Sequence, residues 1–183
     1  MRRVSIVGAS GSGKTSFGRA LAGRLGVPFL ELDHQFWGPN WTSAEPDVFR
    51  ERVRELAAGD GWVIDGNYSS LARPLVWDRA DTVVWLDLPR LQVLIQVVWR
   101  TFRRALLRTE LWHGNREPLG ETLSRRSIVL WSWNQHPRLR RSYPEAMRDA
   151  RWSRLRFVRL RSHREARRFL AAQPGPDPGA PSR

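Results

Sequence analysis

Eight consecutive residues organise this sequence: Gly8-Ala9-Ser10-Gly11-Ser12-Gly13-Lys14-Thr15. They match the phosphate-binding pattern G-x-x-x-x-G-K-[ST] at every fixed position. The apolar run Val4-Ser5-Ile6-Val7 before them predicts a buried strand. After them, Phe17, Leu21 and Leu25 recur every four residues, which predicts a helix over 16–25. The pattern therefore lies between a strand and a helix, as its mechanism requires.

The residue types of this stretch suit a phosphate. Glycine permits backbone angles that other residues resist, so the loop can wrap closely around an anion with its N–H groups pointing inward. Lys14, the one lysine of the 183 residues, is expected to reach the β- and γ-phosphates and to act in catalysis. Thr15 is expected to coordinate Mg²⁺. The predicted nucleotide-binding residues are Gly8, Ser10, Gly11, Ser12, Gly13, Lys14, Thr15 and Ser16.

The composition limits the classes of protein. The chain has no cysteine, which excludes disulfides and thiolate metal sites, and its four histidines are scattered without ligand spacing. The formal net charge of +13 favours anionic partners such as nucleotides, phosphorylated metabolites, nucleic acid or acidic lipid. A GC-rich genome also produces an arginine-rich composition. No apolar run reaches the length of a membrane span, so we expect a soluble, cytoplasmic protein.

Two carboxylates are expected at the same edge of the sheet as the loop. The strand 29–33 ends in Asp33, and the strand 62–66 ends in Asp65-Gly66. Since ligands bind beyond the carboxyl ends of parallel strands, Asp33 is predicted to contact the substrate or act as a general base. A helix cap or loop anchor is the alternative for Asp33. Asp65 is predicted to hold Mg²⁺ through its waters, and Asp87, after the next strand, competes for that role.

The segment 90–108 predicts a buried helix with a basic face. Its apolar residues fall on one stripe, which comprises Leu91, Leu94, Ile95, Val98 and Phe102. Arg100, Arg104 and Arg108 are spaced by four residues and share a face, with Arg103 close by. In phosphoryl transfer, such arginines neutralise charge on the transferring phosphate, so Arg100 and Arg104 are candidate catalytic residues. A solvated basic face is the equally weighted alternative.

The remaining pattern alternates strands with helices and indicates one domain over 1–172. The capping box Thr42-Ser43-Ala44-Glu45 predicts a helix to about residue 58, and Ser162-His163-Arg164-Glu165 opens a last helix to about residue 172. The other expected segments are helices at about 70–77, 123–135 and 144–151, strands at 81–89 and 155–160, a lid at about 105–135 and a disordered tail at 173–183. The predicted fold class is α/β, with a parallel sheet covered by helices on both faces.

Several segments resemble a known family. The phosphate-binding loop is followed by L-D-H-x-F-W-x-P-N-W-T over 32–42, W-V-I-D-G-N-Y over 62–68 and D-T-V-V-W-L-D-L-P over 81–89. Together they resemble the small P-loop proteins labelled DNA topology modulation protein (FlaR-like), relatives of adenylate kinase and shikimate kinase. The resemblance implies a three-layer P-loop kinase fold with a five-stranded sheet in the order 2-3-1-4-5. It also implies ATP and Mg²⁺ as cofactors and a lid after the fourth helix.

The resemblance also implies roles for single residues. In the wider kinase group, the carboxylate at the position of Asp65 serves the metal, and lid arginines serve the phosphates. Shikimate-type kinases use an acid at the position of Asp33 to hold the acceptor hydroxyl. Adenylate kinases continue their Asp-Gly with F-P-R, whose arginine grips the phosphate of the acceptor nucleotide. This chain has Asn67-Tyr68-Ser69 there, which argues against a nucleoside monophosphate as acceptor.

Two functions remain after these observations. The first is an ATP-using, Mg²⁺-dependent phosphotransferase that acts on an unidentified small molecule. The second is a nucleotide-gated regulator that binds nucleic acid, because arginines alternate with Trp152, Phe157 and His163 in the run 148–168. We favour the enzyme, because those apolar residues fall on a strand and its flanking helices, where core positions are expected.

Overall fold

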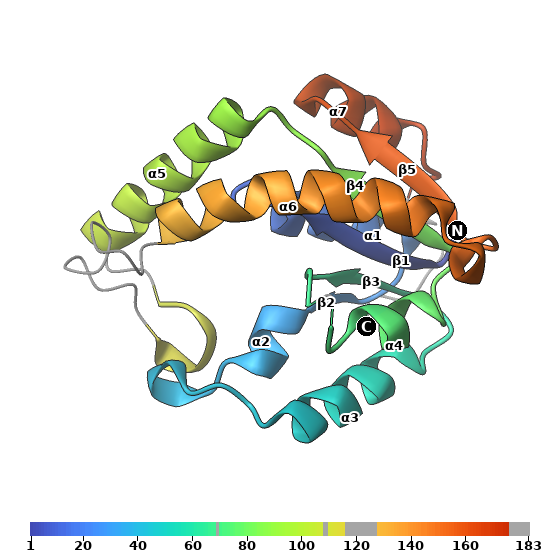
Figure 1. Cartoon of the computed structure of the whole chain (residues 1–183), viewed down its shortest axis with the longest axis horizontal. Helices are drawn as coiled ribbons and strands as arrows, with labels where there is room; N and C mark the ends of the chain where they lie inside the picture. The colour runs from blue at the N-terminus through green and yellow to red at the C-terminus, as the bar shows by residue number, and fades with distance from the viewer. Residues whose placement is uncertain (69, 108–109, 116–127, 176–183) are drawn as a thin grey trace.

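The computed structural model describes residues 1–68, 70–107, 110–115 and 128–175. Within these ranges, five strands form one parallel sheet in the order β2-β3-β1-β4-β5 (Figure 1). The strands are β1 (Arg3–Gly8), β2 (Phe29–Glu31), β3 (Trp62–Asp65), β4 (Thr82–Leu86) and β5 (Arg156–Leu160). In the register of the central strand, Ser5 lies beside Ile64 on one side and Val83 on the other. The predicted fold class and strand order are confirmed.

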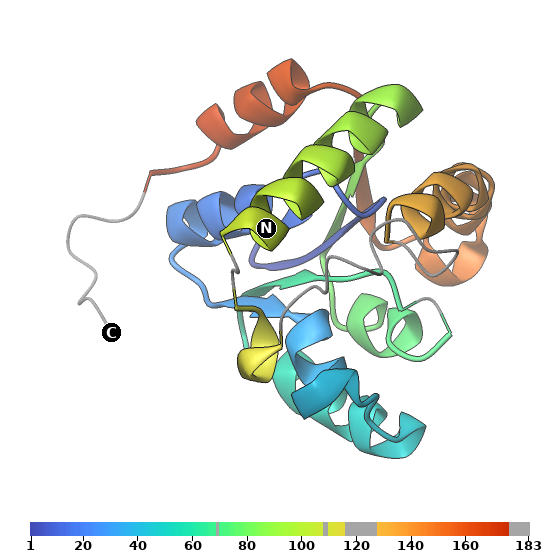
Figure 2. The same ribbon diagram turned by 90° about the vertical axis from the view of Figure 1, so that its left-hand side faces the viewer.

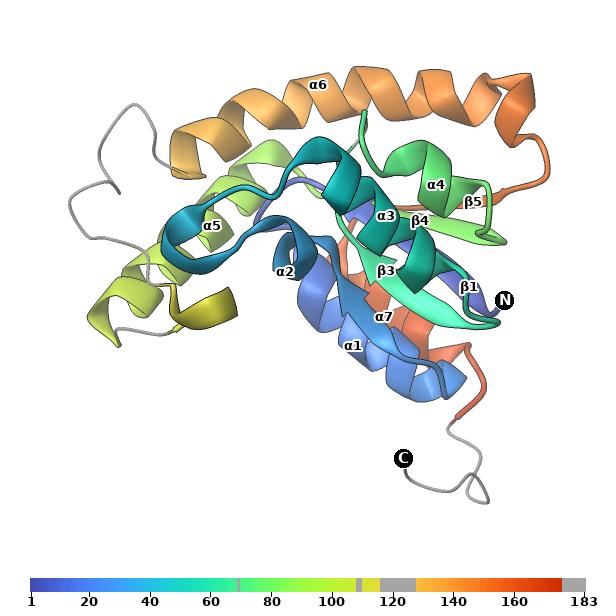
Figure 3. The ribbon, with the colours of Figure 1, turned by 90° about the horizontal axis from the view of Figure 1, so that it is seen from below.

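Helices cover both faces of this sheet. One face packs against α1 (Lys14–Leu25) and α7 (His163–Ala171), and the other against α3 (Pro46–Ala57), α4 (Arg73–Trp77) and α6 (Ile128–Arg148), as Figure 3 shows. The other described helices are α2 (Leu32–Phe36), α5 (Arg90–Leu106) and the short 3-10 helices η1 (Pro39–Trp41), η2 (Trp112–Gly114) and η4 (Ala150–Trp152). Because the strands are parallel, their carboxyl ends share one edge. Figure 2 looks onto that edge, with α5 on one side and α2 and η2 on the other.

Apolar side chains fill the space on both sides of the sheet. Val4 and Ile6 of β1 point to one face and pack in a cluster with Phe17 of α1. The opposite face holds a second cluster, in which the large fully buried rings are Phe49, Trp62, Trp77 and Tyr143. Burying one such side chain contributes about 1.5–3 kcal/mol to the free energy of folding. The two helical layers therefore hold the sheet in place from both faces.

The segment after β2 differs from the predicted loop. Leu32–Phe36 form the helical turn α2, and Asp33 therefore lies in its first turn, one residue beyond α2's start. Leu32 is buried, and the ring of Phe36 packs edge-on against Phe49 at 5.2 Å between centroids. Such tertiary packing closes a turn that the local sequence does not specify, because its polar and aromatic residues have no helical period.

The predicted capping box at 42–45 is wrong. Helix α3 begins at Pro46, and its N-cap, Glu45, makes no side-chain capping bond. The Thr42 hydroxyl donates instead to the carbonyl of Pro39, 2.8 Å away, at the end of η1. Proline at the first turn supplies the helix start here, since its missing N–H is one that no helix start can satisfy internally. The second predicted capping box is confirmed, because the Ser162 hydroxyl accepts from the N–H of Glu165 at 3.1 Å.

Helix α5 reverses the predicted burial pattern. The buried positions are Val93, Val97 and Thr101. Of the expected core stripe, Leu94 is half-buried, and the others are exposed, at 65% for Leu91, 60% for Ile95, 48% for Val98 and 58% for Phe102. Both faces of the helix carry apolar residues, so their period alone does not reveal which face meets the protein. The face that is buried is the one that packs on the phosphate-binding loop and on α6.

Helix α6 continues through two prolines. The sequence predicts an end at His136-Pro137 and a new helix at Pro144, but one helix spans Ile128–Arg148. A proline removes one N–H from the helical ladder, which destabilises a helix unless packing offsets the loss. Leu139 and Tyr143 are buried between these prolines and supply that packing.

Parts of the predicted lid and tail lie outside the described residues. For the lid at 105–135 these are residues 108–109 and 116–127, and for the tail at 173–183 they are residues 176–183. Among the helices that the structure describes, none combines the length and hydropathy that crossing a bilayer requires.

Candidate functional site

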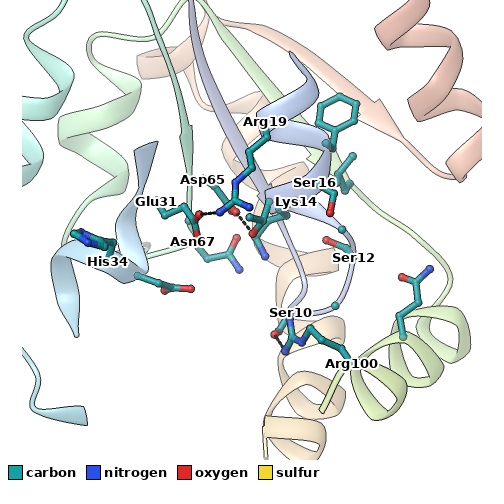
Figure 4. Close-up of a pocket in the computed structure, with 18 of the residues that line it drawn as sticks. Ser10, Ser12, Lys14, Ser16, Arg19, Glu31, His34, Asp65, Asn67 and Arg100 are labelled. Carbon is teal, nitrogen blue, oxygen red and sulfur yellow. Dashed lines mark hydrogen bonds and ion pairs between the residues drawn. The ribbon is translucent and has the colours of Figure 1, made fainter. Parts of the chain in front are cut away.

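The phosphate-binding loop joins β1 to α1 through glycines in the left-handed region. Gly11 and Gly13 have φ values of 86° and 84°, which cost residues with a Cβ about 1–2 kcal/mol each. Helix α1 begins at Lys14, so the free N–H groups of its first turn face the loop. The Lys14 ammonium donates to the carbonyl of Ala9 at 3.3 Å, and Figure 4 shows Ser10, Ser12 and Lys14 around the loop. The loop has the geometry of an anion site.

Two helices that are distant in sequence hold the tip of this loop. The guanidinium of Arg100 on α5 donates to the Ser10 hydroxyl at 3.2 Å, and Ser132 on α6 donates to the Ser10 carbonyl at 2.7 Å. Gly11 also packs so closely on α5 that a Cβ there would lie 2.2 Å from Cγ2 of Val97. The shape of the loop therefore depends on α5 and α6 as well as on its own residues.

A buried carboxylate, Asp65, lies beside the first turn of α1. The Thr15 hydroxyl donates to its Oδ2 at 2.8 Å, and its Oδ1 is buried with no hydrogen-bond partner in the described structure. Burial raises the pKa of Asp65 to about 6, against the opposing attraction of the Lys14 ammonium. A divalent cation would satisfy the orphaned oxygen and the negative charge together.

The donor set around Asp65 fits Mg²⁺. The described residues contain no group of three or more histidines and carboxylates that could surround a metal. Mg²⁺ commonly keeps several waters and binds through one or two carboxylates plus substrate phosphates. Thr15 and Asp65, next to a loop that binds phosphate, offer that arrangement.

Asp33 enters the same cavity from α2. Its carboxylate is near enough to Asp65 to contribute to the raised pKa of Asp65. The Tyr68 hydroxyl donates to Oδ1 of Asp33 at 2.7 Å. Burial first, and then the Asp33 carboxylate, raise the pKa of Tyr68, which keeps its phenol protonated and donating. The hydrogen bond to Oδ1 thus orients the Asp33 carboxylate, and its other oxygen can contact a ligand.

Asn67 is a site residue that sequence reasoning missed. Its side-chain amide donates to the carbonyl of Gly8 at 2.7 Å, and its Oδ1 accepts from the N–H of Gly8 at 3.0 Å. The Tyr143 hydroxyl also donates to that Oδ1 at 3.0 Å. Asn67 therefore ties the end of β3 to the first residue of the phosphate-binding loop. Its place directly after Asp65-Gly66 was the one signal in the sequence.

These side chains line one cavity of about 1620 Å³ at the carboxyl edge of the sheet. Pockets for a single small molecule are commonly 300–1,000 Å³, so this cavity has room for two substrates side by side. Arg100 and Arg104 both line it, together with Lys14, as the spacing of the arginines predicts. Arg103 is exposed and is not among the lining residues, and Arg108 lies outside the described residues.

Asp87 has a different environment from Asp65. It is buried and accepts two hydrogen bonds each from Arg140 and Arg159, at 2.6–3.2 Å. Both carboxylate oxygens are thereby occupied by guanidinium groups that join β4 to α6 and β5. Asp87 is an ion-pair anchor in this structure, and the competing metal role considered for it is not supported.

The basic run 148–168 offers few accessible rings for nucleic-acid bases. Trp152 is buried, and Phe157 belongs to the packed layer around Trp77, with 5.5 Å between the ring centroids. His163 lines the cavity and contacts Gln96. Base stacking needs exposed aromatic faces, so these residues do not favour the regulator hypothesis.

Comparison with known proteins relates this chain to small-molecule kinases. No family model matches it. A shikimate kinase of Symbiobacterium thermophilum is 34% identical over 98 residues, which are 46% of this chain and 56% of that protein. The chain thus spans about half the length of this relative. The resemblance to topology modulation proteins remains a prediction.

Solved structures agree in architecture. A shikimate kinase from Acinetobacter baumannii, solved in complex with shikimate, has a TM-score of 0.56 at 20% identity. The match covers 93% of this chain and 89% of the shikimate kinase chain. A gluconokinase from Sinorhizobium meliloti has a TM-score of 0.50 at 20% identity over 93% and 91% of the two chains. The chain has the fold of the shikimate kinases. At these identities the likeness establishes the fold, and the activity is argued from the site.

Proposed function

We propose that this protein is a P-loop kinase that transfers the γ-phosphoryl group of ATP, with Mg²⁺, to a hydroxyl group of a small molecule. The observation that carries the proposal is the placement of Lys14, Thr15 and the buried Asp65 around one loop, with Asp33 in the same cavity. A protein that switches state with a bound nucleotide needs Lys14, Thr15 and Asp65. The Asp33 carboxylate is an additional group, and because Tyr68 orients it, it suits a second substrate.

The donor side is built to hold a triphosphate. The N–H groups at the start of α1 bind phosphate oxygens, and the Lys14 ammonium leaves the Ala9 carbonyl to meet the β- and γ-phosphates. Thr15 and Asp65 would hold Mg²⁺, which would neutralise phosphate charge. Arg100 and Arg104 face the same cavity and stabilise the negative charge of the transferring group.

The acceptor side supplies a base. The free oxygen of Asp33 accepts the proton of the acceptor hydroxyl as that oxygen bonds to the γ-phosphorus and the bond to the β-phosphate oxygen breaks. The hydrogen bond from Tyr68 keeps the carboxylate in one orientation during this step. Catalysis then rests on positioning and charge neutralisation, which is the general strategy of phosphoryl transfer.

Calorimetry with Mg²⁺ and ATP, followed by ADP release in a screen of hydroxylated acceptors, tests the proposal. Lys14→Ala should lower turnover by at least about 100-fold while the folded state persists, because the variant removes the ammonium that neutralises the negative charge of the transferring phosphate. Arg79→Ala is the matched control, since Arg79 is an exposed cation that does not line the cavity. Full ATP consumption by Lys14→Ala, or no binding heat with the parent protein, would contradict the assignment.

A further inference from the structure

The two halves of the cavity differ in charge. The half beside the phosphate-binding loop has cationic lining residues from α1, α5 and α7, which are Lys14, Arg19, Arg100, Arg104 and Arg167. It also contains the carboxylates Glu31, which pairs with Arg19 at 2.6 Å, and Asp65. The other half is built from α2, η1, residues 66–68, Ser70 and residues 110–113, and we call it the acceptor half. Among the described lining residues of the acceptor half, the carboxylates are Asp33 and Glu110, and none is arginine or lysine. Figure 4 shows His34 of this half across the cavity from Ser10 and Ser12.

Aromatic rings form much of the wall of the acceptor half. Trp37, Trp41 and Trp112 line it and are each half-buried. Trp37 and Trp41 pack edge to face, with 5.7 Å between ring centroids and 82° between ring planes. Trp37 and Trp112 therefore bring flat apolar ring surface to the same wall of the cavity as the Asp33 carboxylate.

The backbone that carries these rings is strained. Asn40, Trp41 and His113 have φ values of 55°, 56° and 57°, and they are the non-glycine residues with positive φ in the described chain. All three lie in η1 or η2, on opposite sides of the junction between the two turns. Unfavourable backbone conformations of this kind persist where the surrounding structure imposes them, and they gather at ligand sites.

Asn115 imposes this conformation. Its buried side-chain amide donates to the carbonyl of Gly38 at 2.8 Å and accepts from the N–H of Trp41 at 3.2 Å. Its backbone carbonyl accepts from the N–H of Leu111 at 2.7 Å. One residue thus fastens η2 to η1, which fixes Trp41 and Trp112 on the same wall. A buried polar clamp that stabilises two strained turns is a constructed site.

We infer that the acceptor half binds an uncharged ring compound with hydroxyl groups and a flat apolar face, the chemistry shared by nucleosides and neutral sugars. This inference rests on the proposed kinase function and adds the class of its acceptor. The flat face stacks on the tryptophans, and one hydroxyl donates to Asp33. An acceptor with its own carboxylate or phosphate meets the Asp33 carboxylate here and, among the described lining residues of this half, no arginine or lysine.

ATP and Asp33 supply every group that the reaction of such an acceptor needs. The hydroxyl oxygen bonds to the γ-phosphorus of ATP, and the bond from that phosphorus to the bridging oxygen breaks. ADP leaves with the electron pair of the broken bond. The hydroxyl proton passes to the free oxygen of Asp33 and then to water, and the product is a phosphate monoester.

The first test compares acceptors of different charge. Adenosine, cytidine, glucose and myo-inositol are the neutral arms, and shikimate and gluconate are the anionic arms. ADP release and the thermal shift with Mg²⁺ and ADP are recorded for each compound. We expect kcat/KM to be at least tenfold higher for a neutral compound than for either acid, and the preferred neutral arm separates nucleoside from sugar.

Other outcomes separate the two proposals. A preference for shikimate or gluconate overturns the inference and leaves the kinase intact. A second outcome also overturns the inference and leaves the kinase intact. In it, the parent protein binds ATP and Lys14→Ala does not, but no neutral compound causes ADP release or a thermal shift. If the protein does not bind ATP, the proposed function itself fails, and the inference falls with it.

The second test removes one ring. Trp112→Ala should raise KM for the preferred neutral compound by about tenfold or more, because one stacked ring is lost, with a smaller change in kcat. Trp99→Ala is the matched control, since Trp99 is 67% exposed on α5 and does not line the cavity. Equal KM values for Trp112→Ala and Trp99→Ala would overturn the inference. A fall in kcat with KM unchanged would do the same, because it indicates a role other than stacking.

Discussion

The hydroxyl of Tyr68 lies 2.7 Å from Oδ1 of Asp33 and joins the segment after β3 to the first turn of α2. This bond spans 35 residues of sequence and orients the carboxylate on which the proposed proton transfer depends. The ring of Tyr68 packs against Phe36 and Phe49, each at 4.9 Å between centroids, so the phenol has little freedom to turn away.

Tyr68→Phe removes this bond and keeps the ring. We expect kcat/KM for the preferred acceptor to fall by about tenfold, since hydrogen bonds to a charged group contribute about 1.5–3 kcal/mol. The affinity for ATP, measured by calorimetry, should change less than twofold. Tyr143→Phe is the comparison, because its hydroxyl bonds to Asn67 instead. Equal losses of acceptor kcat/KM in both variants would show that Tyr68 does not act through Asp33.

Gly11→Ala tests the contact between the phosphate-binding loop and α5. The new Cβ would lie 2.2 Å from Cγ2 of Val97, at a φ of 86° that alanine resists, so the loop or the helix must shift. We expect a loss of about 2–4 kcal/mol in the free energy of unfolding and weaker ATP binding. Denaturant unfolding and calorimetry measure the two effects.

Gly23→Ala is the control for that substitution. Gly23 lies in α1 with open space around its Cα, so alanine there should stabilise the helix by about 0.5–1 kcal/mol. The double variant Gly11→Ala/Val97→Ala should lose less stability than the sum of the two single variants, because it removes the 2.2 Å contact with Cγ2 of Val97. Additive losses would mean that this contact does not set the cost of Gly11→Ala.

Asp65→Asn should stabilise the protein without Mg²⁺ at neutral pH. The folded pKa of about 6 exceeds the ordinary value of 3.8, so the native state binds more protons than the unfolded chain between these values. The contribution of this carboxyl to stability is full below pH 3.8 and is lost as the pH rises through 6. The resulting loss in the free energy of unfolding corresponds to about 3 kcal/mol. Asparagine does not titrate, so the variant does not lose this stability as the pH rises.

Urea unfolding in EDTA from about pH 3.5 to pH 8 measures this effect. The parent protein should lose stability relative to Asp65→Asn as the pH rises from 3.8 through about 6, with no further change above that, and the variant should also lose the effect of Mg²⁺ on ATP binding. Parallel curves for the two proteins would show that Asp65 is not buried as a costly charge.

Asp87→Asn separates the ion-pair anchor from the metal site. Asparagine cannot balance Arg140 and Arg159, so we expect the free energy of unfolding to fall by about 2–4 kcal/mol. The Mg²⁺ concentration that gives half-maximal turnover should stay within twofold of the parent value. A large rise in that concentration would restore Asp87 as a metal ligand.

The donor side could be predicted from sequence because its signals are local. Lys14, Thr15 and Asp65 are placed by a loop pattern and by strands whose apolar residues are continuous, and the structure brings Thr15 and Asp65 to 2.8 Å. Parallel strands then place their ends on one edge. Arg100 and Arg104 share the cavity for an equally local reason, the four-residue repeat of a helix.

The remaining features depend on contacts between distant residues, which one sequence does not show. Ser132 and Ser10 are 122 residues apart, and Asn115 and Gly38 are 77 apart, so no local pattern announces either bond. The face of α5 was misassigned because both of its faces are apolar. Packing around Tyr143, and the ion pairs of Asp87, keep α6 helical where prolines indicated a break.

The junction held by Asn115 is separate from the phosphate-binding loop and from β1 and α1, which flank it. In the proposed kinase, substitutions in η1 and η2 would therefore exchange one acceptor for another and leave ATP binding unchanged. Selection would then diversify the acceptor of the proposed kinase while its phosphoryl donor stays the same.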